Sequence, residues 1–318
     1  MSLPIFEIAI MGRAVWNLHS LNNEGTVGNV SEPRTVVLAD GSKSDGISGE
    51  MLKHIHAQNV WLIAEDKSVF CQSCQTLQPQ KADKSSALDD VSKKAPSARR
   101  AQVIMDAALQ GCALCDLHGF LRTKEAIPRS SVVEFGWAVA LRNEYHRDVH
   151  IHARHVVEGR ADTEQQEGAA AAQMVYHRPT RSGTYALVSV FCPWRIGLNE
   201  VNYHYVEGVD RESRYRLGLD AYKAVFARTD GAMTSTRLPH VEGITGSVVI
   251  STRNFPAPIA SPLRDDYQNT LKELQKVTAG IELAEFDSVQ RLFGILEEVK
   301  SRPLYSLKIA PTPKKGKG

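Results

Sequence analysis

The segment from residue 17 to residue 56 constrains the fold most, because it passes from a polar loop through a short apolar strand into the start of a helix. The loop, residues 17–32, is rich in Asn and Gly, which accept the positive φ angles of tight turns. A strand is expected at 34–38, and Ser48 is well placed to cap a helix that runs to about Ile63. The loop at 17–32 can wrap around a polar ligand.

The helix start at Ser48 predicts an anion-binding site. Unpaired backbone N–H groups and the positive end of the helix dipole attract phosphate groups. Lys43 and Ser44 are expected to converge on this end from a preceding turn, and Lys53 and His54 add charge along the first helical turns. Taken alone, such a Lys-bearing helix start is more often a solvated surface than a binding site.

Length and charge limit the classes of protein that fit. The 318 residues are 42% apolar, which suits one large domain with a sizeable core and insertions. The net charge of +2 means that a nucleic-acid partner would have to be held by a local basic surface. No apolar run approaches the roughly 20 residues that span a bilayer. The apolar residues of MSLPIFEIAI are not preceded by the basic segment with which a signal peptide begins. We therefore expect a cytoplasmic protein that stays out of the membrane.

Strand and helix patterns alternate along the rest of the chain, which favours an α+β sheet core with polar insertions but does not select one topology. Residues 75–97 are rich in Lys, Asp, Ser and Gln and are expected to be a mobile insertion, and the acidic segment 159–173 is expected to project from the core. Further strands are expected at 6–10, 132–141, 184–191 and 304–309, and further helices are expected to begin near residues 99, 210, 261 and 288.

Two CxxC pairs, Cys71 with Cys74 and Cys112 with Cys115, predict a structural zinc site. Four thiolates fill the tetrahedral coordination that zinc prefers and leave no position for a catalytic water. The spacer between the pairs is longer than that of a zinc ribbon, but the polar insertion can loop out. His118 could replace one thiolate, and unmetallated cysteines or a redox pair are the alternatives.

Three histidines, His150, His152 and His155, resemble the HxHxDH motif of metallo-β-lactamase-like hydrolases. The Asp of that motif is replaced by Arg154, whose charge would repel a second metal ion. Side chains alternate along a strand, so His150, His152 and Arg154 would share one face. The pattern therefore favours a polar strand face, with a metal-dependent hydrolase as the alternative.

Two separated blocks of the chain resemble one known family. The first comprises LNNEGTVGN and EPRTVVLADGSKSDGISGEMLKHIHA, and the second comprises GAMTSTRLPH at 231–240 with the later strand SVVIS. Both are similar to the DevR autoregulator-like family, the backbone subunit that binds CRISPR RNA in type I CRISPR effector (Cascade) complexes. The blocks occur in the family's order, whereas the middle of the chain matches less clearly.

The resemblance implies a modified RRM-like, ferredoxin-type core, called the palm, within a single domain over residues 1–310. It implies a finger insertion at about 60–130 and a thumb at about 154–182, and it leaves 311–318 as a basic disordered tail. It also implies a subunit without enzymatic activity that polymerises head to tail along CRISPR RNA beside other Cascade subunits. Such a subunit would support pairing of the RNA with target DNA, in antiviral defence or guided targeting.

The resemblance makes phosphate binding the favoured role of the basic helix start. Asp40 or Asp45 would be the candidates for the RNA cleavage that related type III subunits perform, but the blocks resemble type I subunits, which bind without cutting. The family's name raises a sequence-specific DNA-binding autoregulator as a further alternative, although no helix-turn-helix pattern is evident. The residues expected to contact RNA are His19, Leu21, Asn22, Lys43, Ser44, Ser48, Lys53, His54, Met174, Arg178, Arg181 and Arg237.

Overall fold

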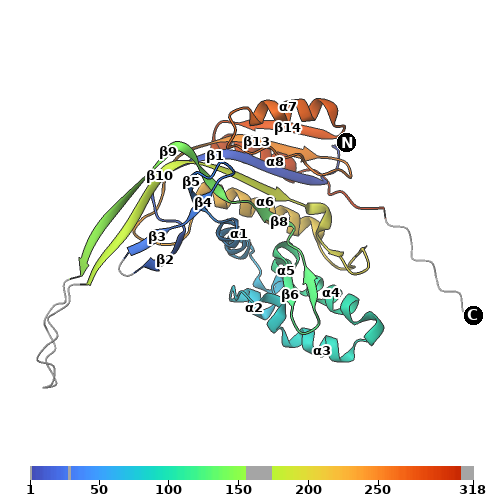
Figure 1. The fold of residues 1–318 in the computed structure, drawn as a ribbon. Coiled ribbons are helices and arrows are strands. Elements are labelled where there is room, and N and C mark those ends of the chain that lie inside the picture. The colour runs from blue at the N-terminus through green and yellow to red at the C-terminus, as the bar shows by residue number, and fades with distance from the viewer. Residues whose placement is uncertain (1, 28–29, 155–173, 309–318) are drawn as a thin grey trace, which may run out of the picture.

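The computed structural model describes residues 2–27, 30–154 and 174–308. Figure 1 shows a broad sheet with helices packed against it, a long two-stranded ribbon that leaves the sheet at one side, and a mostly helical insertion below. The segment 159–173 and the tail 311–318 lie outside the described residues. Within the part that is described, no helix is both long enough and apolar enough to cross a bilayer.

Four long strands form the centre of the sheet: β1 (Glu7–His19), β9 (Ala138–Arg154), β10 (Met174–Phe191) and β13 (His240–Ser251). β1 lies between β10 and β13 and is antiparallel to both, and β9 is antiparallel to β10 on its other side. The order of the central strands is therefore β13-β1-β10-β9. Shorter strands widen both edges of this sheet, namely β5 (Lys43–Ile47) and β4 (Thr35–Val37) beyond β9, and β14 (Ile281–Phe286) beyond β13.

Two helices connect the central strands and cover one face of the sheet. α1 (Gly49–Ile63) follows β1 in the chain, and α6 (Arg211–Ala227) follows β10. The central elements therefore run strand, helix, strand, strand, helix, strand. α8 (Val289–Lys300) packs beside α6 on the same face, and α7 (Tyr267–Val277) covers the opposite face near β14 (Figure 1).

Side-chain alternation along β1 explains how one sheet buries two apolar layers. Ile8 and Ile10 point into the main core with α1 and α6, whereas Ala9 and Met11 point into the smaller core under α7. All four side chains are buried. The strand predicted at 6–10 is confirmed and continues well beyond that prediction, to His19.

The predicted helix caps are confirmed. Ser48 accepts the backbone N–H of Met51 at the start of α1, and Asp210 accepts that of Ser213 at the start of α6. Gly49 lies close to the short strand β8 (Val133–Phe135). An added Cβ on Gly49 would stand 2.1 Å from a backbone oxygen of that strand. A glycine is therefore required where α1 meets the sheet.

The prediction that 75–97 is a mobile segment is wrong, because this stretch contains a 3-10 turn and a capped helix. Ser85 caps α3, and both Leu88 of this helix and Ala82 of the 3-10 turn are buried. The polar residues that suggested disorder cover the solvent side of an amphipathic helix. The insertion comprises η1 (Lys67–Val69), α2 (Gln72–Gln75), η2 (Lys81–Lys84), α3 (Ser86–Lys94), η3 (Ser97–Arg99), α4 (Arg100–Gly111), α5 (Ala113–His118), β6 (Phe120–Arg122) and β7 (Ile127–Arg129).

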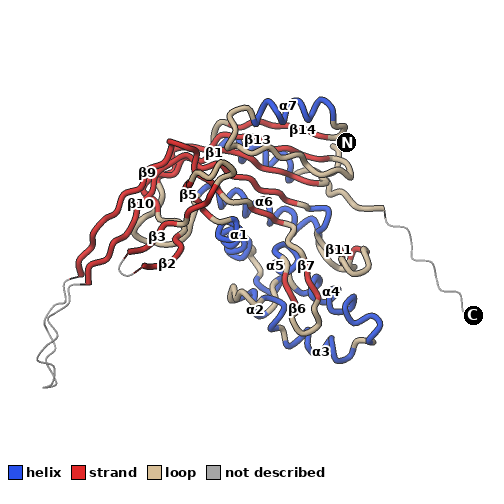
Figure 2. The backbone as a smooth tube through the Cα atoms, viewed as in Figure 1, coloured by secondary structure: helices blue, strands red, loops and turns tan. Residues whose placement is uncertain are grey.

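β9 and β10 are longer than the strands predicted at 132–141 and 184–191, and they continue together away from the sheet as the ribbon in Figure 2. Met174 pairs with Arg154 at the far end of the described ribbon. Residues 142–144 and 146–151 of β9 are exposed on both faces of the strand, so no apolar alternation marked them as strand.

Other boundaries also differ from prediction. The polar loop contains β2 (Asn23–Val27) and β3 (Val30–Pro33), and the helix expected near 261 begins only at Tyr267. Pro262 instead offers its carbonyl oxygen to the Arg13 guanidinium. The strand expected at 304–309 is reduced, within the described residues, to one isolated bridge between Ile5 and Leu304. The remaining short elements are η4 (Pro193–Arg195), β11 (Leu198–Asn199) and β12 (His204–Tyr205).

Candidate nucleic-acid interface and cysteine cluster

A buried carboxylate joins the root of the ribbon to the sheet edge. Asp45 on β5 is fully buried, with Oδ1 2.6 Å from Arg147 Nη2 and Oδ2 2.9 Å from Arg181 Nη1. Tyr185 donates its hydroxyl to the same Oδ2 at 2.8 Å, and its oxygen lies 3.0 Å from Nε2 of His19. Asp45 therefore has no solvent-exposed oxygen with which to activate a water molecule or an RNA hydroxyl.

Burial sets the protonation of two members of this network. Burial, followed by the charge of Arg181, lowers the pKa of His19 to about 3, so its imidazole is neutral near pH 7. Burial, followed by the charge of Asp45, raises the pKa of Tyr185, so its phenol keeps the proton that it donates. Both side chains are therefore neutral partners of the ion pairs around Asp45.

A hollow of about 610 Å³ lies between the root of the ribbon and the loop 231–239. Arg178 reaches it from β10 and Arg237 from the loop. Burial, followed by the charge of Arg178, lowers the pKa of Arg237, and the second of these effects shows that the two guanidinium groups are near enough to repel each other. Among the described residues, no acidic side chain lines this hollow, so it favours a polyanion. Its lining residues are Leu18, His150, Ile151, Arg178, Thr180, Thr236 and Arg237.

The serines predicted to bind phosphate at the start of α1 make hydrogen bonds within the protein. Ser48 caps the helix, and its own backbone N–H donates to Asn22 Oδ1 at 2.8 Å. Ser44 is buried and donates its hydroxyl to the carbonyl oxygen of Ala140 at 2.7 Å. The expectation that Lys43 and Ser44 lie in a turn at the helix start is wrong, because both belong to β5.

The other predicted contact residues fall into separate places. Lys43 is exposed on β5. Burial, followed by the charge of Lys81, lowers the pKa of Lys53. Because Lys81 belongs to the insertion, Lys53 lies beside the insertion. His54 is exposed on α1, and Leu21 is fully buried in the core.

Two groups of the predicted residues do meet in space. Arg178 and Arg237 line the hollow together. His19 and Arg181 share the Asp45 network, and Arg181 Nη2 also donates to the backbone oxygen of Asn22 at 2.7 Å. The side chain of Met174 is outside the described part of the chain.

The histidine motif contributes one described side chain to the same hollow. His150 Nε2 lies 2.9 Å from Thr180 Oγ1, and both residues line the hollow. The side chain of His152 and the whole of His155 lie outside the described residues. His150 is therefore placed as a polar wall of the hollow beside Arg178.

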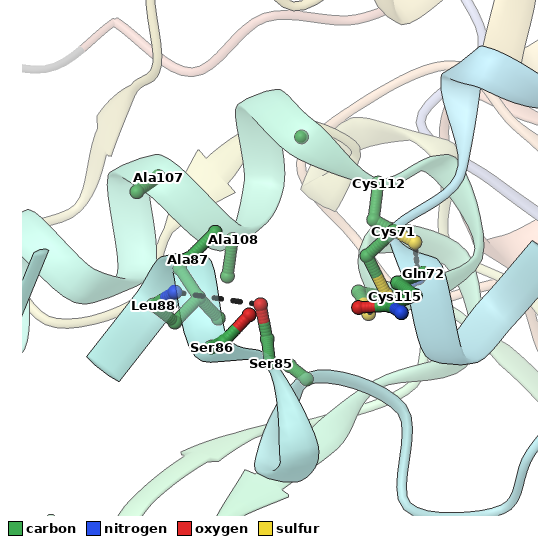
Figure 3. Close-up of a pocket in the computed structure, with 12 residues that line it drawn as sticks. Cys71, Gln72, Ser85, Ser86, Ala87, Leu88, Ala107, Ala108, Cys112 and Cys115 are labelled. Carbon is green, nitrogen blue, oxygen red and sulfur yellow. Dashed lines mark hydrogen bonds between the residues drawn. The ribbon is translucent and has the colours of Figure 1, made fainter. Parts of the chain in front are cut away.

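The four cysteines of the CxxC pairs form one cluster in the insertion. Three of them, Cys71, Cys112 and Cys115, are drawn in Figure 3. Their sulfur atoms all lie within 4.8 Å of one another, and Cys115 Sγ lies 3.9 Å from that of Cys71 and 3.7 Å from that of Cys74. Cys71 and Cys112 occupy the N-cap positions of α2 and α5, and Cys112 Sγ accepts the N–H of Cys115 at 3.3 Å. Two helix starts thus present the sulfurs to one point.

The spacing of the sulfurs fits a tetrahedral metal ion. A zinc ion with Zn–S bonds of about 2.3 Å holds its four sulfurs about 3.8 Å apart, close to the contacts of Cys115. Hydrogen bonds from neighbouring thiols, first that of Cys112, lower the pKa of Cys71, which favours a thiolate. Lys81 donates to the backbone oxygens of His118 and Gly119 beside the cluster. His118 is not one of the clustered ligands.

Buried contacts that hold the insertion against the core left no signal in the sequence. His56 Nδ1 on α1 lies 3.0 Å from His118 Nε2 on α5, and both rings are buried. Asp116 pairs with Arg129 at 2.7 Å and with Arg214 of α6 at 2.7 Å. His56 and Arg214 are 62 and 98 residues from their partners, so no local pattern connects them.

The fold is shared with subunits of CRISPR complexes. One similar chain comes from a structure described as "CRISPR RNA-guided surveillance complex, pre-nicking", with a TM-score of 0.52, 14% identity, and coverage of 92% of this chain and 99% of that one. Another comes from a "CRISPR RNA-guided surveillance complex", with a TM-score of 0.50, 12% identity, and coverage of 93% and 98%. At such identities the likeness is one of fold.

The family follows from the sequence. The family model "CRISPR-associated negative auto-regulator DevR/Csa2" matches residues 10–272. The chain belongs to this family, which confirms the resemblance seen in the two sequence blocks. Among curated proteins, no sequence matches the chain significantly.

Proposed function

We propose that the protein is a non-enzymatic backbone subunit of a type I Cascade complex that binds CRISPR RNA. The observation that carries the proposal is the hollow that brings Arg178 and Arg237 together, with no acidic side chain among the described residues that line it. Membership of the DevR/Csa2 family and the shared fold support it. The burial of Asp45 argues against this carboxylate as a catalyst for RNA cleavage.

We further propose that the central elements are an RRM-like, ferredoxin-type palm. The order of the four antiparallel strands and the place of α1 and α6 on one face support this assignment. The helical insertion, within about 60–130, would be the finger. The thumb, at about 154–182, would begin at the end of the ribbon, much of it beyond the described residues.

Recognition in such a subunit rests on the RNA backbone. Guanidinium groups neutralise phosphates without reading bases, so one protein can carry any spacer sequence. The target DNA is then selected by base pairing with the RNA. Copies would contact one another head to tail, a heterologous interface that does not close and so continues along the RNA.

We also propose that Cys71, Cys74, Cys112 and Cys115 hold a structural zinc ion. The sulfur spacing and the burial of three of the four thiols support this assignment. When bound, zinc would supply a closed tetrahedral link with no position for substrate. The cysteines themselves would then tie the start of α2 to the start of α5 and so brace the finger.

The proposal is tested by coexpressing the chain with a CRISPR array and its partner subunits, purifying the complex and sequencing the RNA within it. We expect repeat–spacer transcripts with all spacers represented. The double variant Arg178→Ala with Arg237→Ala should lose this RNA. Arg264→Ala, which removes an exposed arginine paired with Asp266 next to α7, should retain it.

Other outcomes would favour the alternative functions. Protein that is folded and assembled but free of RNA would refute guide binding. Chelator-sensitive hydrolysis that His150→Ala abolishes would favour the hydrolase. Sequence-preferring binding to duplex DNA would favour the autoregulator.

A further inference from the structure

We propose that Cys71 and Cys115 form a disulfide when hydrogen peroxide reaches the metal-free cysteine cluster. A covalent bond would then replace the metal ion as the link between α2 and α5. This inference concerns the insertion alone and does not depend on RNA binding.

A dissolved oxidant has access to the cluster. A cavity of about 190 Å³ opens beside the cluster, and Cys71, Cys112 and Cys115 line its wall together with small side chains from α3 and α4 (Figure 3). This volume admits several water-sized molecules and therefore hydrogen peroxide. Cys71 is partly exposed, whereas Cys112 and Cys115 are each 1% exposed and Cys74 is 2% exposed. Cys71 is therefore the sulfur that a dissolved oxidant meets first.

Cys115 is the proposed partner of Cys71. Its Sγ lies 3.9 Å from that of Cys71 and 3.7 Å from that of Cys74, and all four sulfur atoms lie within 4.8 Å of one another. Disulfide formation requires the sulfurs to approach to about 2.05 Å, a movement that side-chain rotation and a small shift of the helix starts can supply. Both of these contacts join one CxxC pair to the other, so the proposed bond links the two pairs.

The chemistry balances with peroxide as the two-electron oxidant. The Cys71 thiolate attacks one peroxide oxygen, the O–O bond breaks, and hydroxide leaves, which gives a sulfenic acid on Cys71. The Cys115 thiolate then attacks the Cys71 sulfur, the S–S bond forms, and a second hydroxide leaves. The two protons that the thiols released on ionising convert the hydroxides to water, so one peroxide is reduced to two waters as two thiols become one disulfide. A bound metal would slow the reaction by occupying both sulfurs.

Peptide mapping distinguishes the possible bonds. Trypsin cleavage after Lys67 and Lys81 places Cys71 and Cys74 in one peptide, and cleavage after Arg100 and Arg122 places Cys112 and Cys115 in another. A bond between the pairs links the two peptides, whereas a bond within a pair leaves a single peptide that has lost two hydrogens.

The experiment treats the full-length protein, freed of metal by a chelator, with hydrogen peroxide and then blocks the remaining thiols before digestion. We expect the linked peptide, with fragmentation that assigns the bond to Cys71 and Cys115. The same digest of Cys115→Ser should lack a Cys71–Cys115 bond, and Cys192→Ser, which removes a buried cysteine outside the cluster, should retain it.

The inference is overturned if the wild-type protein forms bonds only within each pair, links Cys115 through Cys74, or keeps all its thiols. Because the wild-type digest alone decides these outcomes, poor folding of a variant does not blur the test. Metal-free starting material also keeps the result separate from the zinc proposal, which a metal analysis of untreated protein tests on its own.

Discussion

Arg181 and Asp45 form a fully buried ion pair, with Nη1 and Oδ2 2.9 Å apart, although the two residues are 136 positions apart in the chain. Arg147 shares the same carboxylate from β9. One acidic side chain therefore fixes β5, β9 and β10 where the ribbon leaves the sheet. Removing it would leave two guanidinium groups facing each other, one of them without access to water.

We expect Asp45→Ala to lower the free energy of unfolding by about 3 kcal/mol, because loss of one partner strands a buried charge. Asp40→Ala is the matched control, since Asp40 pairs with Arg142 at the surface, and it should cost less than about 1 kcal/mol. Urea unfolding followed by circular dichroism measures both. Equal losses in the two variants would contradict the role of the buried pair.

The hollow predicts how RNA affinity responds to salt. Each of Arg178→Ala and Arg237→Ala should weaken binding to all RNA sequences alike and reduce the slope of log affinity against log salt by about 1 in magnitude. Filter binding or fluorescence anisotropy at several salt concentrations gives the slope. Arg264→Ala should leave it unchanged. If instead only Lys43→Ala with Lys53→Ala flattens the slope, the RNA follows the start of α1 and not the hollow.

Local patterns predicted the local structure well. Ser48 and Asp210 were recognised as helix caps because each side-chain oxygen accepts a backbone N–H only three residues further along the chain. The CxxC spacing likewise indicated that each pair could share a ligand site, since a pair is set by a single turn of chain, and the structure joins the two pairs in one cluster. Where the deciding partner is close in sequence, the sequence was sufficient.

Long-range partners decided the remaining features. Arg181 appeared to be an RNA contact, but Asp45, far away in the chain, buries it. Ser44 appeared to face a phosphate, but Ala140 on the neighbouring strand accepts its hydroxyl. The hollow depends on Arg178 and Arg237, which only the pairing of β1 with β10 and β13 brings together. Composition alone also misread 75–97, whose polar side chains cover a helix.

The cysteine cluster predicts one bound zinc ion per chain. Cys115→Ser should abolish metal binding, whereas Cys192→Ser, outside the cluster, should retain it. Because the metal links two parts of the insertion, its removal should cost a few kcal/mol and lower the melting temperature by roughly 5–10 °C. Elemental analysis by mass spectrometry and thermal melts with and without chelator check both claims. Metal-free wild-type protein purified from zinc-supplemented cells would contradict the site.

The buried His19 predicts a pH-dependent contribution to stability. Burial and the charge of Arg181 lower its folded pKa to about 3, from an ordinary value of 6.5 in the unfolded chain. Between these values the unfolded chain binds one more proton than the folded protein, so this group reduces stability as the pH falls below 6.5 and has no such effect above it. The slope is about 1.4 kcal/mol per pH unit for one proton.

The variant His19→Asn, which keeps a polar side chain but does not titrate, isolates this contribution. At pH 7.5 it should be less stable than the wild type, because the contact with Tyr185 is altered. As the pH falls from 6.5 to 4.5 the gap should close by about 2.3 kcal/mol, since only the wild type loses stability through this group. Urea unfolding at each pH measures the gap, and all other titrating groups cancel in the difference. A gap that stays constant over this range would mean that His19 takes up its proton in the folded protein as it does in the unfolded chain, and that the network around Asp45 is open to water.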